Sequence, residues 1–217
     1  PPPPPPPPPP LFLLMIRRPP SPTPLYSPAA PDAYKRPATG GASGIGRAVA
    51  TRFREAGAEV AVFDLDAEGE GAQAVDVSDE AAFARAMDEA RLRLGAIDIL
   101  VNNAGVAIDE GPLEACDLEA VRRTLDVNLL GVLHGLKHAR AAMGDGGSII
   151  NTASLAATLP FPTYAGYAAT KARVIYIRPQ HALELGRCDQ QRPQHVVGAA
   201  PAAAAAALLP VPRRGRG

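Results

Sequence analysis

Residues 39–46 read T-G-G-A-S-G-I-G, and this stretch decides the fold of the chain. Glycine at positions 40, 44 and 46 lets the backbone turn tightly and come close to a bound phosphate. Because a helix N-terminus favours negative charge, the stretch predicts a pyrophosphate site, with a plain glycine-rich turn as the alternative. The loop opens a helical pattern whose apolar stripe consists of Ile45, Ala48, Val49, Phe53 and Ala56.

The segment before the loop, K-R-P-A at 35–38, is unlike the buried strand that should lead into it. Proline has no amide hydrogen to donate and is not expected in a central strand of a sheet. The sequence therefore predicts that the first strand is degraded.

Beyond the loop, predicted strands alternate with predicted helices. A helix should follow Ser78 as its cap, with Asp79 in its first turn, and a long helix should run from about 117 to 143. This alternation predicts an α/β fold, a Rossmann-like doubly wound parallel sheet with helices on both faces. The apolar runs that indicate strands lie near 59–63, 73–77, 97–101 and 148–153.

Asp64 ends the run at 59–63, about twenty residues after the glycine loop, where a carboxylate accepts hydrogen bonds from an adenosine ribose. It repels a 2′-phosphate, and neither Ser43 nor Leu65 is a basic residue that would offset this repulsion. The expected cofactor is therefore NAD rather than NADP. After the run at 97–101, the motif N-N-A-G (102–105) permits close approach to a flat ring, although alone it can be only a turn.

Tyr167 and Lys171 are four residues apart, which places them on one face if Tyr167 opens a helix. The ammonium would lower the pKa of the phenol from ~10 toward neutrality, where it can exchange a proton. Ser154 ends the run at 148–153, so its hydroxyl is expected at the carboxyl end of a strand, where ligands bind. Alone, such a Y-x-x-x-K pair is most often an exposed helix face.

Asn128 lies inside the long predicted helix and matters to a site only if it faces that site. His134 and His138 have the spacing of metal ligands, but no third ligand accompanies them, so we expect surface or half-buried histidines and no metal. Cys116 and Cys188 show neither a metal-ligand spacing nor a disulfide pattern, which is typical of a reducing compartment.

Composition narrows the partners of this chain of 217 residues. The 22 basic residues equal the 22 acidic ones, so no basic excess indicates nucleic acid. The apolar run at 11–16 is too short to span a bilayer and lacks the features of a signal peptide. We expect a soluble cytoplasmic protein with no membrane or nucleic-acid partner.

Residues from about 38 to 186 resemble a classical short-chain dehydrogenase/reductase, whose motifs occur here in order: T-G-G-A-S-G-I-G, Asp64, N-N-A-G, Asn128, Ser154 and Y-A-A-T-K. The resemblance implies NAD-dependent interconversion of a secondary alcohol and a ketone, and it allows a homo-oligomer. It implies that Tyr167 is the general acid/base and that Lys171 lowers the pKa of that phenol and holds the nicotinamide ribose. It also implies that Ser154 orients the substrate oxygen and that Asn128 holds the water of a proton relay. The cofactor-binding residues that it implies are Gly40, Ser43, Gly44, Ile45, Gly46, Asp64, Asp76, Val77, Asn103, Ala104, Gly105, Tyr167 and Lys171.

Three segments depart from the family pattern. Residues 1–36 open with ten prolines and are expected to be non-native or disordered, before a dinucleotide-binding domain at 37–186. Residues 176–181 replace an apolar helical stretch, and the Ala/Pro/Arg-rich tail at 187–217 lacks the next strand.

These departures bear on whether the site assembles. Losing two strands would exhaust the ~5–15 kcal/mol by which native domains are stable, so we expect a chain that does not assemble a working site. Two alternatives to an enzyme are a non-catalytic dinucleotide-binding module and the inactive product of a damaged reading frame.

Overall fold

The computed structural model describes residues 34–108, 110–186 and 194–199. Most of the Pro-rich segment predicted at 1–36, and most of the tail predicted at 187–217, lie outside these residues. Within the described ranges, no helix is long and apolar enough to cross a membrane.

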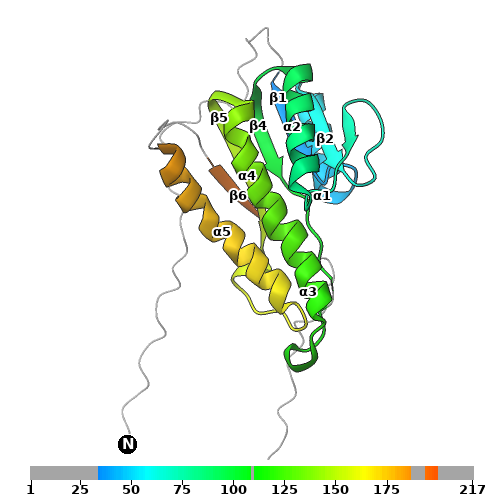
Figure 1. The fold of residues 1–217 in the computed structure, drawn as a ribbon, viewed down its shortest axis with the longest axis vertical. Helices are drawn as coiled ribbons and strands as arrows, with labels where there is room; N and C mark the ends of the chain where they lie inside the picture. Colours follow the sequence, from blue (N-terminus) through cyan, green and yellow to red (C-terminus); the bar gives the residue numbers. More distant parts are fainter. Residues whose placement is uncertain (1–33, 109, 187–193, 200–217) are drawn as a thin grey trace, which may run out of the picture. The chain divides into compact units, whose positions relative to one another are not determined.

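Six parallel strands in the described residues form one sheet, in the order β3-β2-β1-β4-β5-β6 (Figure 1). The order reverses between β1 and β4, so the loops that leave the carboxyl ends of these two strands diverge and open a crevice. This topology confirms the predicted α/β doubly wound sheet. The strands are β1 Lys35–Thr39, β2 Glu59–Asp64, β3 Ala72–Ala74, β4 Ile97–Asn102, β5 Met143–Ser154 and β6 Gln194–Ala199.

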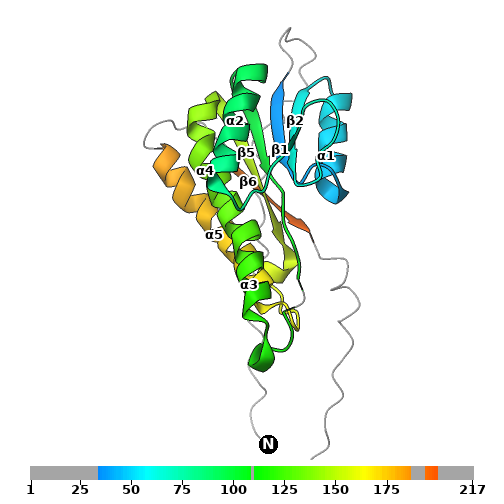
Figure 2. The ribbon, with the colours of Figure 1, turned by 45° about the vertical axis from the view of Figure 1, so that its right-hand side comes forward.

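Helices cover both faces of the sheet. Figure 2 shows α2, α4 and α5 on one face and α1 on the other. The long helix predicted from about 117 to 143 is α3 and α4, joined by a π-helical turn at Asp126–Leu130. The helices are α1 Gly44–Glu55, α2 Glu80–Leu94, α3 Leu118–Leu125, α4 Gly131–Ala142 and α5 Ala165–Gly186.

The main hydrophobic core lies on the face of the sheet that carries α2, α4 and α5. Phe63 of β2 and Phe83 of α2 are fully buried there and meet edge to face, with ring centroids 6.0 Å apart. Burial of each such side chain contributes roughly 1.5–3 kcal/mol, and the T-shaped geometry adds to it. A smaller cluster under α1 contains Ala50, Ala58, Val60 and Val62.

The first strand is present, which corrects the prediction that it is degraded. Pro37 is buried in β1 and pairs with Ala61 of β2. The Glu59 amide donates to the Tyr34 carbonyl, and the Gly40 amide donates to the Phe63 carbonyl. The even-numbered residues from 34 to 40 therefore direct their backbone groups toward β2. Alternate residues of a parallel strand direct their backbone groups to opposite sides, so the missing N–H of Pro37 falls on the β4 side. The ladder there is short, with Ala38 paired to Val101, and the missing donor is therefore tolerated.

A strand also follows α5, which corrects the prediction that it is lost. β6 pairs in parallel with β5 from Ile149–Gln194 to Ser154–Ala199. Without it β5 would be an edge with unpaired backbone groups, and the segment 194–199 contains two consecutive valines that favour a strand. α5 likewise continues through the departure at 176–181, with Pro179 inside it. Because both strands are present, the expected loss of two strands no longer gives a reason to expect an unassembled site.

One cap is also corrected. Asp79, not Ser78, caps α2, because its carboxylate accepts from the amides of Ala81 and Ala82 at 2.8 and 3.0 Å. Ser78 instead donates its hydroxyl to Asp76 at 2.6 Å. The Asp79 carboxylate satisfies two open amides and, unlike a neutral serine hydroxyl, also places a negative charge at the helix N-terminus.

Candidate active site

A cavity of about 510 Å³ opens in the crevice at the carboxyl ends of the strands. Its walls come from the loops after β1, β2, β3 and β4, from the end of β5, and from α5. Gly46, Asn128 and Ser154 are not among the residues that line it. The predicted cofactor-binding residues that do line it are Gly40, Ser43, Gly44, Ile45, Asp64, Asp76, Val77, Asn103, Ala104, Gly105, Tyr167 and Lys171.

The glycine loop packs tightly against the loop after β4. Gly40 has a φ of +65°, and a Cβ at this position would lie 2.9 Å from the Ala104 backbone. A Cβ at Gly46 would overlap the Gly40 carbonyl oxygen, so this glycine lets the turn close rather than lining the cavity. Ile45, expected on the core stripe of α1, is 52% exposed and forms part of the cavity wall instead.

The N-terminus of α1 differs from those of the two helices that follow it. α2 and α3 carry capping carboxylates, Asp79 and Asp117, and an acidic residue in the first turn. α1 has no acidic residue in its first turn, and Ser43 makes no side-chain cap. Its first amides are therefore left for an anion, and they lie beside a cavity that is lined by Ser43 and Gly44.

Thr39, to which the sequence assigned no role, joins the two loops on either side of the crevice. Its Oγ1 accepts from the amides of Asn103 and Ala104 at 2.8 and 2.9 Å. The hydroxyl donates to the Val101 carbonyl at 3.4 Å, and the side chain is buried. A threonine at the end of the strand where the sheet order reverses is the sequence signal that could have indicated this bridge.

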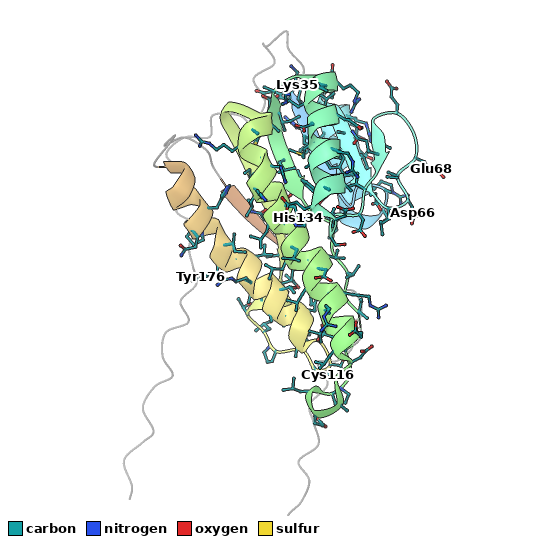
Figure 3. All side chains as sticks on the ribbon, in the orientation of Figure 1. Lys35, Asp66, Glu68, Cys116, His134 and Tyr176 are labelled. Carbon is teal, nitrogen blue, oxygen red and sulfur yellow. The ribbon has the colours of Figure 1, made fainter. Side chains whose placement is uncertain are left out.

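Asp64 lies at the end of β2 on the cavity wall, about twenty residues beyond the glycine loop as expected. Its Oδ2 accepts from the Ala42 amide at 2.9 Å, which fixes the carboxylate beside that loop. Figure 3 shows Asp66 and Glu68 on the loop that leaves β2, and both are exposed. Among the residues that line the cavity only Lys171 is basic, so the wall around Asp64 is acidic.

Tyr167 and Lys171 lie together on the first turns of α5, both almost fully buried, with exposures of 7% and 4%. The Lys171 Nζ is 5.9 Å from the centroid of the Tyr167 ring and donates to the Thr152 carbonyl at 3.1 Å. Burial lowers the pKa of Lys171 from its ordinary 10.5 to about 8. The side chain therefore still carries its charge at neutral pH, next to the phenol.

Asn128 is fully buried within the π-helical turn between α3 and α4. Its Oδ1 accepts from the Val106 amide at 2.7 Å, and its Nδ2 donates to the Val106 carbonyl at 2.8 Å. A Cβ at Gly105 would lie 3.1 Å from the Asn128 Oδ1 and 3.2 Å from the Lys171 Nζ. The amide thus faces the site across Gly105 and fixes the loop there; π-helical turns are frequent at such positions.

Ser154 lies at the carboxyl end of β5, as the sequence predicted, and is 4% exposed. Its Oγ accepts from the Ala156 amide at 3.2 Å and so caps a short 3₁₀ turn at Leu155–Ala157. Thr152, also without a predicted role, supplies the carbonyl that Lys171 contacts. Its hydroxyl donates to the Asn103 Oδ1 at 3.2 Å, which links β5 to the loop after β4.

The histidine pair lies apart from the cavity lining, on α4, and both rings are half-buried as predicted (Figure 3 labels His134). The His134 Nδ1 is 2.9 Å from the Val77 carbonyl, and the His138 Nε2 is 3.3 Å from the Glu80 carboxylate. Over the described part of the chain, no three His, Cys, Asp or Glu side chains gather to hold a metal. Cys116 is a half-buried free thiol, and Cys188 lies outside the described residues.

Comparison with known proteins gives three kinds of match. A family model described as enoyl-(acyl carrier protein) reductase matches residues 40–192. The short-chain dehydrogenase reductase ATA1 of Arabidopsis thaliana is 40% identical over 161 residues, 68% of this chain and 59% of that protein. The 3-beta-hydroxysteroid dehydrogenase of Comamonas testosteroni is 41% identical over 149 residues, 63% and 58% of the two chains. The ligand-free aldohexose dehydrogenase of Thermoplasma acidophilum superposes with a TM-score of 0.72 at 28% identity, over 78% of this chain and 67% of that one.

The extent of these matches is partial. The chain spans less than two thirds of the length of the curated relatives just named.

Proposed function

This chain belongs to the classical short-chain dehydrogenase/reductase family, and from that membership we propose that it is an NAD-dependent oxidoreductase that interconverts a secondary alcohol and a ketone. The observation that carries the proposal is the burial of Tyr167 and Lys171 side by side on the wall of the cavity that the glycine loop and Asp64 also line. A proton-exchanging phenol, a cation and a phosphate-binding loop around one cavity favour dinucleotide-dependent chemistry.

The residues around the cavity fit a nicotinamide dinucleotide. The open N-terminus of α1, with Gly40 and Gly44 at positive φ, suits a pyrophosphate. Asp64 suits the adenosine ribose, while Asp76 and Val77 line the wall beyond it. When bound, the cofactor would supply the electron acceptor for oxidation of the alcohol. Glycine at 105 lets the loop at 103–105 pack closely on Asn128 and Lys171, because a Cβ there would meet both side chains.

Tyr167 is the residue we assign to proton transfer. As the phenolate, its oxygen would take the proton of the alcohol while the hydride leaves the carbon that becomes the carbonyl, and the resulting phenol would return the proton in the reverse direction. The Lys171 ammonium, with its Nζ 5.9 Å from the ring, would stabilise the negative charge that the phenolate oxygen carries before it takes this proton. Ser154 would hydrogen-bond the substrate oxygen, and Asn128 would hold a water that connects Lys171 to solvent.

Preference for NAD over NADP follows from the charge around Asp64. A 2′-phosphate on the adenosine ribose would meet this carboxylate, with Asp66 and Glu68 on the loop that follows. Like charges about 4 Å apart repel by about 1 kcal/mol or more, depending on exposure. Lys171 does not offset this repulsion, because its ammonium is held at Thr152 rather than at Asp64. The 2′-hydroxyl of NAD instead offers the carboxylate a donor.

We expect an apolar alcohol as the substrate. Leu155 follows Ser154 directly and Leu159 lies five residues after it; they are 49% and 48% exposed, so they offer apolar surface near the proposed substrate oxygen. Burial of such surface against a substrate is favourable by roughly 25 cal/mol per Å².

The test is a titration of the protein with NADH and with NADPH, followed by fluorescence of the reduced nicotinamide, and then a panel of secondary alcohols with NAD. We expect tighter binding of NADH and NAD-dependent oxidation of apolar members of the panel. Binding without turnover would instead favour a dinucleotide-binding module, and absence of binding would refute the proposal.

A further inference from the structure

Glu110, in the loop after β4, is a buried charge that the proposed chemistry does not use. Its side chain is 1% exposed, and among the side chains that the structure describes only Glu110 and Lys171 are carboxylate or ammonium groups with near-complete burial. A buried carboxylate is costly unless hydrogen bonds compensate for the lost water. The contacts of this carboxylate therefore indicate what it is for.

Both carboxylate oxygens of Glu110 accept from the first turn of α5. Oε1 accepts from the Tyr167 amide at 2.8 Å, and Oε2 accepts from the Gly166 amide. In most helices these amides donate to the side chain of the residue that precedes the helix. In α5 that residue is Tyr164, whose phenol is not a capping group. A residue 57 positions before Tyr167 thus supplies the cap of α5.

The backbone of Glu110 is anchored at both ends. Its amide donates to the carbonyl of Thr163 at 3.0 Å, and its carbonyl accepts from the amide of Asp117, the cap residue of α3, at 2.8 Å. Thr163 has a φ of +64°, which is unfavourable for a β-branched residue and must be held by its surroundings. Glu110 therefore fixes the turn before α5 as well as its first amides.

Gly166 indicates how closely the carboxylate approaches the helix. A Cβ at this position would lie 2.7 Å from Oε1 of Glu110, closer than such atoms come. Glycine is disfavoured inside a helix, yet here it leaves room for the carboxylate against the backbone.

We propose that Glu110 is a positioning residue for Tyr167: its carboxylate fixes the first turn of α5 so that the phenol faces the cavity beside Lys171. This inference rests on the proposed role of Tyr167 in proton transfer. If the two amides are released, the start of α5 should relax while the glycine loop, to which none of these Glu110 hydrogen bonds runs, keeps its contacts. The expected signature is a loss of kcat with little change in cofactor affinity, since a misplacement of about 1 Å can cost about 100-fold in rate.

The primary variant is Glu110→Gln. The glutamine oxygen can serve one amide, but its NH₂ group then opposes the other amide hydrogen. Glu110→Asp is the conservative variant, which keeps the charge and both oxygens. Asp79→Asn is the matched control, because Asp79 also takes two backbone amides at the start of a helix but does not line the cavity. We expect kcat to fall about 10- to 100-fold in Glu110→Gln, to recover in part in Glu110→Asp, and to stay unchanged in Asp79→Asn.

A second readout does not depend on turnover. The ring ¹³C resonance of Tyr167, assigned by its loss in Tyr167→Phe, should move in Glu110→Gln and stay in place in Asp79→Asn. If the Tyr167 resonance moves in Glu110→Gln but the wild type shows no turnover, the positioning role is supported and the proposed function is refuted.

Gly166→Ala provides the test if Glu110→Gln fails to fold. The added methyl displaces the carboxylate, while alanine raises the helix propensity of α5. If Glu110 only stabilised this helix, kcat of the Gly166→Ala variant would therefore stay unchanged. We expect a lower kcat and a moved Tyr167 resonance at unchanged NADH affinity. If neither kcat nor the resonance changes in the folded variants, Glu110 does not position Tyr167.

Discussion

Replacement of Lys171 by methionine would separate the cost of burying this ammonium from its use in the site. The methionine side chain is similar in length and carries no charge, so it can occupy the buried space beside Tyr167. We expect Lys171→Met to abolish turnover and, at the same time, to raise the free energy of unfolding at pH 7.

The magnitude follows from the pKa of Lys171. Burial lowers this pKa from 10.5 to about 8, and at about 1.4 kcal/mol per pKa unit the charged form is disfavoured in the folded chain by about 3 kcal/mol. The variant also loses the hydrogen bond to the Thr152 carbonyl, and this loss lowers its stability by about 1–2 kcal/mol. A net stabilisation of about 1–2 kcal/mol at pH 7 is expected.

The pH dependence identifies the cause. Below about pH 8 both the folded and the unfolded wild-type chain hold the proton, so the full cost of burial applies. Between about 8 and 10.5 the folded chain has released the proton and the unfolded chain has not, so wild-type stability rises with pH. The advantage of Lys171→Met should therefore shrink across this window.

Urea unfolding at pH 7 and at pH 10, followed by far-ultraviolet circular dichroism, measures this difference. Lys137→Met is the matched control, because Lys137 is exposed, with a side-chain exposure of 65%, and pairs with Glu80 on the surface. Its stability should change little, with no shift between the two pH values. A Lys171→Met variant that is less stable than wild type at pH 7, or whose advantage is the same at both pH values, would refute the reasoning.

Two further substitutions test the cofactor end of the cavity. Asp64→Ala should shift the preference from NAD toward NADP, measured as the ratio of the two dissociation constants, whereas equal affinities in the wild type would already contradict the assignment. Thr39→Val should leave the amides of Asn103 and Ala104 without their acceptor, lower the free energy of unfolding by about 1–3 kcal/mol and weaken NADH binding. Thr124→Val, which removes a buried hydroxyl that bonds within α3, is its control and should leave NADH binding unchanged.

The parts of the site that could be predicted from the sequence are those encoded by short spacings. The glycines of residues 39–46 and the four-residue spacing of Tyr167 and Lys171 indicate local geometry directly. The apolar runs likewise predicted four of the six strands that the structure describes, because buried parallel strands are rich in apolar residues. Agreement at this level needs no knowledge of which segments meet.

The parts that the sequence did not predict depend on contacts between distant segments. Thr39 meets Asn103, 64 residues away, and Glu110 meets Tyr167, 57 residues away, so neither role has a local signature. In the sequence, Pro37 argues against a strand, because its missing amide hydrogen would be costly in a fully paired ladder. Which neighbour that amide would face becomes known only from the register with β2.

Turnover of wild type and of Tyr167→Phe can be compared directly at saturating NAD with an apolar secondary alcohol. Phenylalanine keeps the shape and burial of the ring but removes the hydroxyl that we assign to proton transfer. We expect NADH to bind both proteins with similar affinity, the wild type to oxidise the alcohol, and kcat of the variant to be lower by a factor of about 100 or more. Equal turnover by the two proteins would show that another group moves the proton, and would contradict the account.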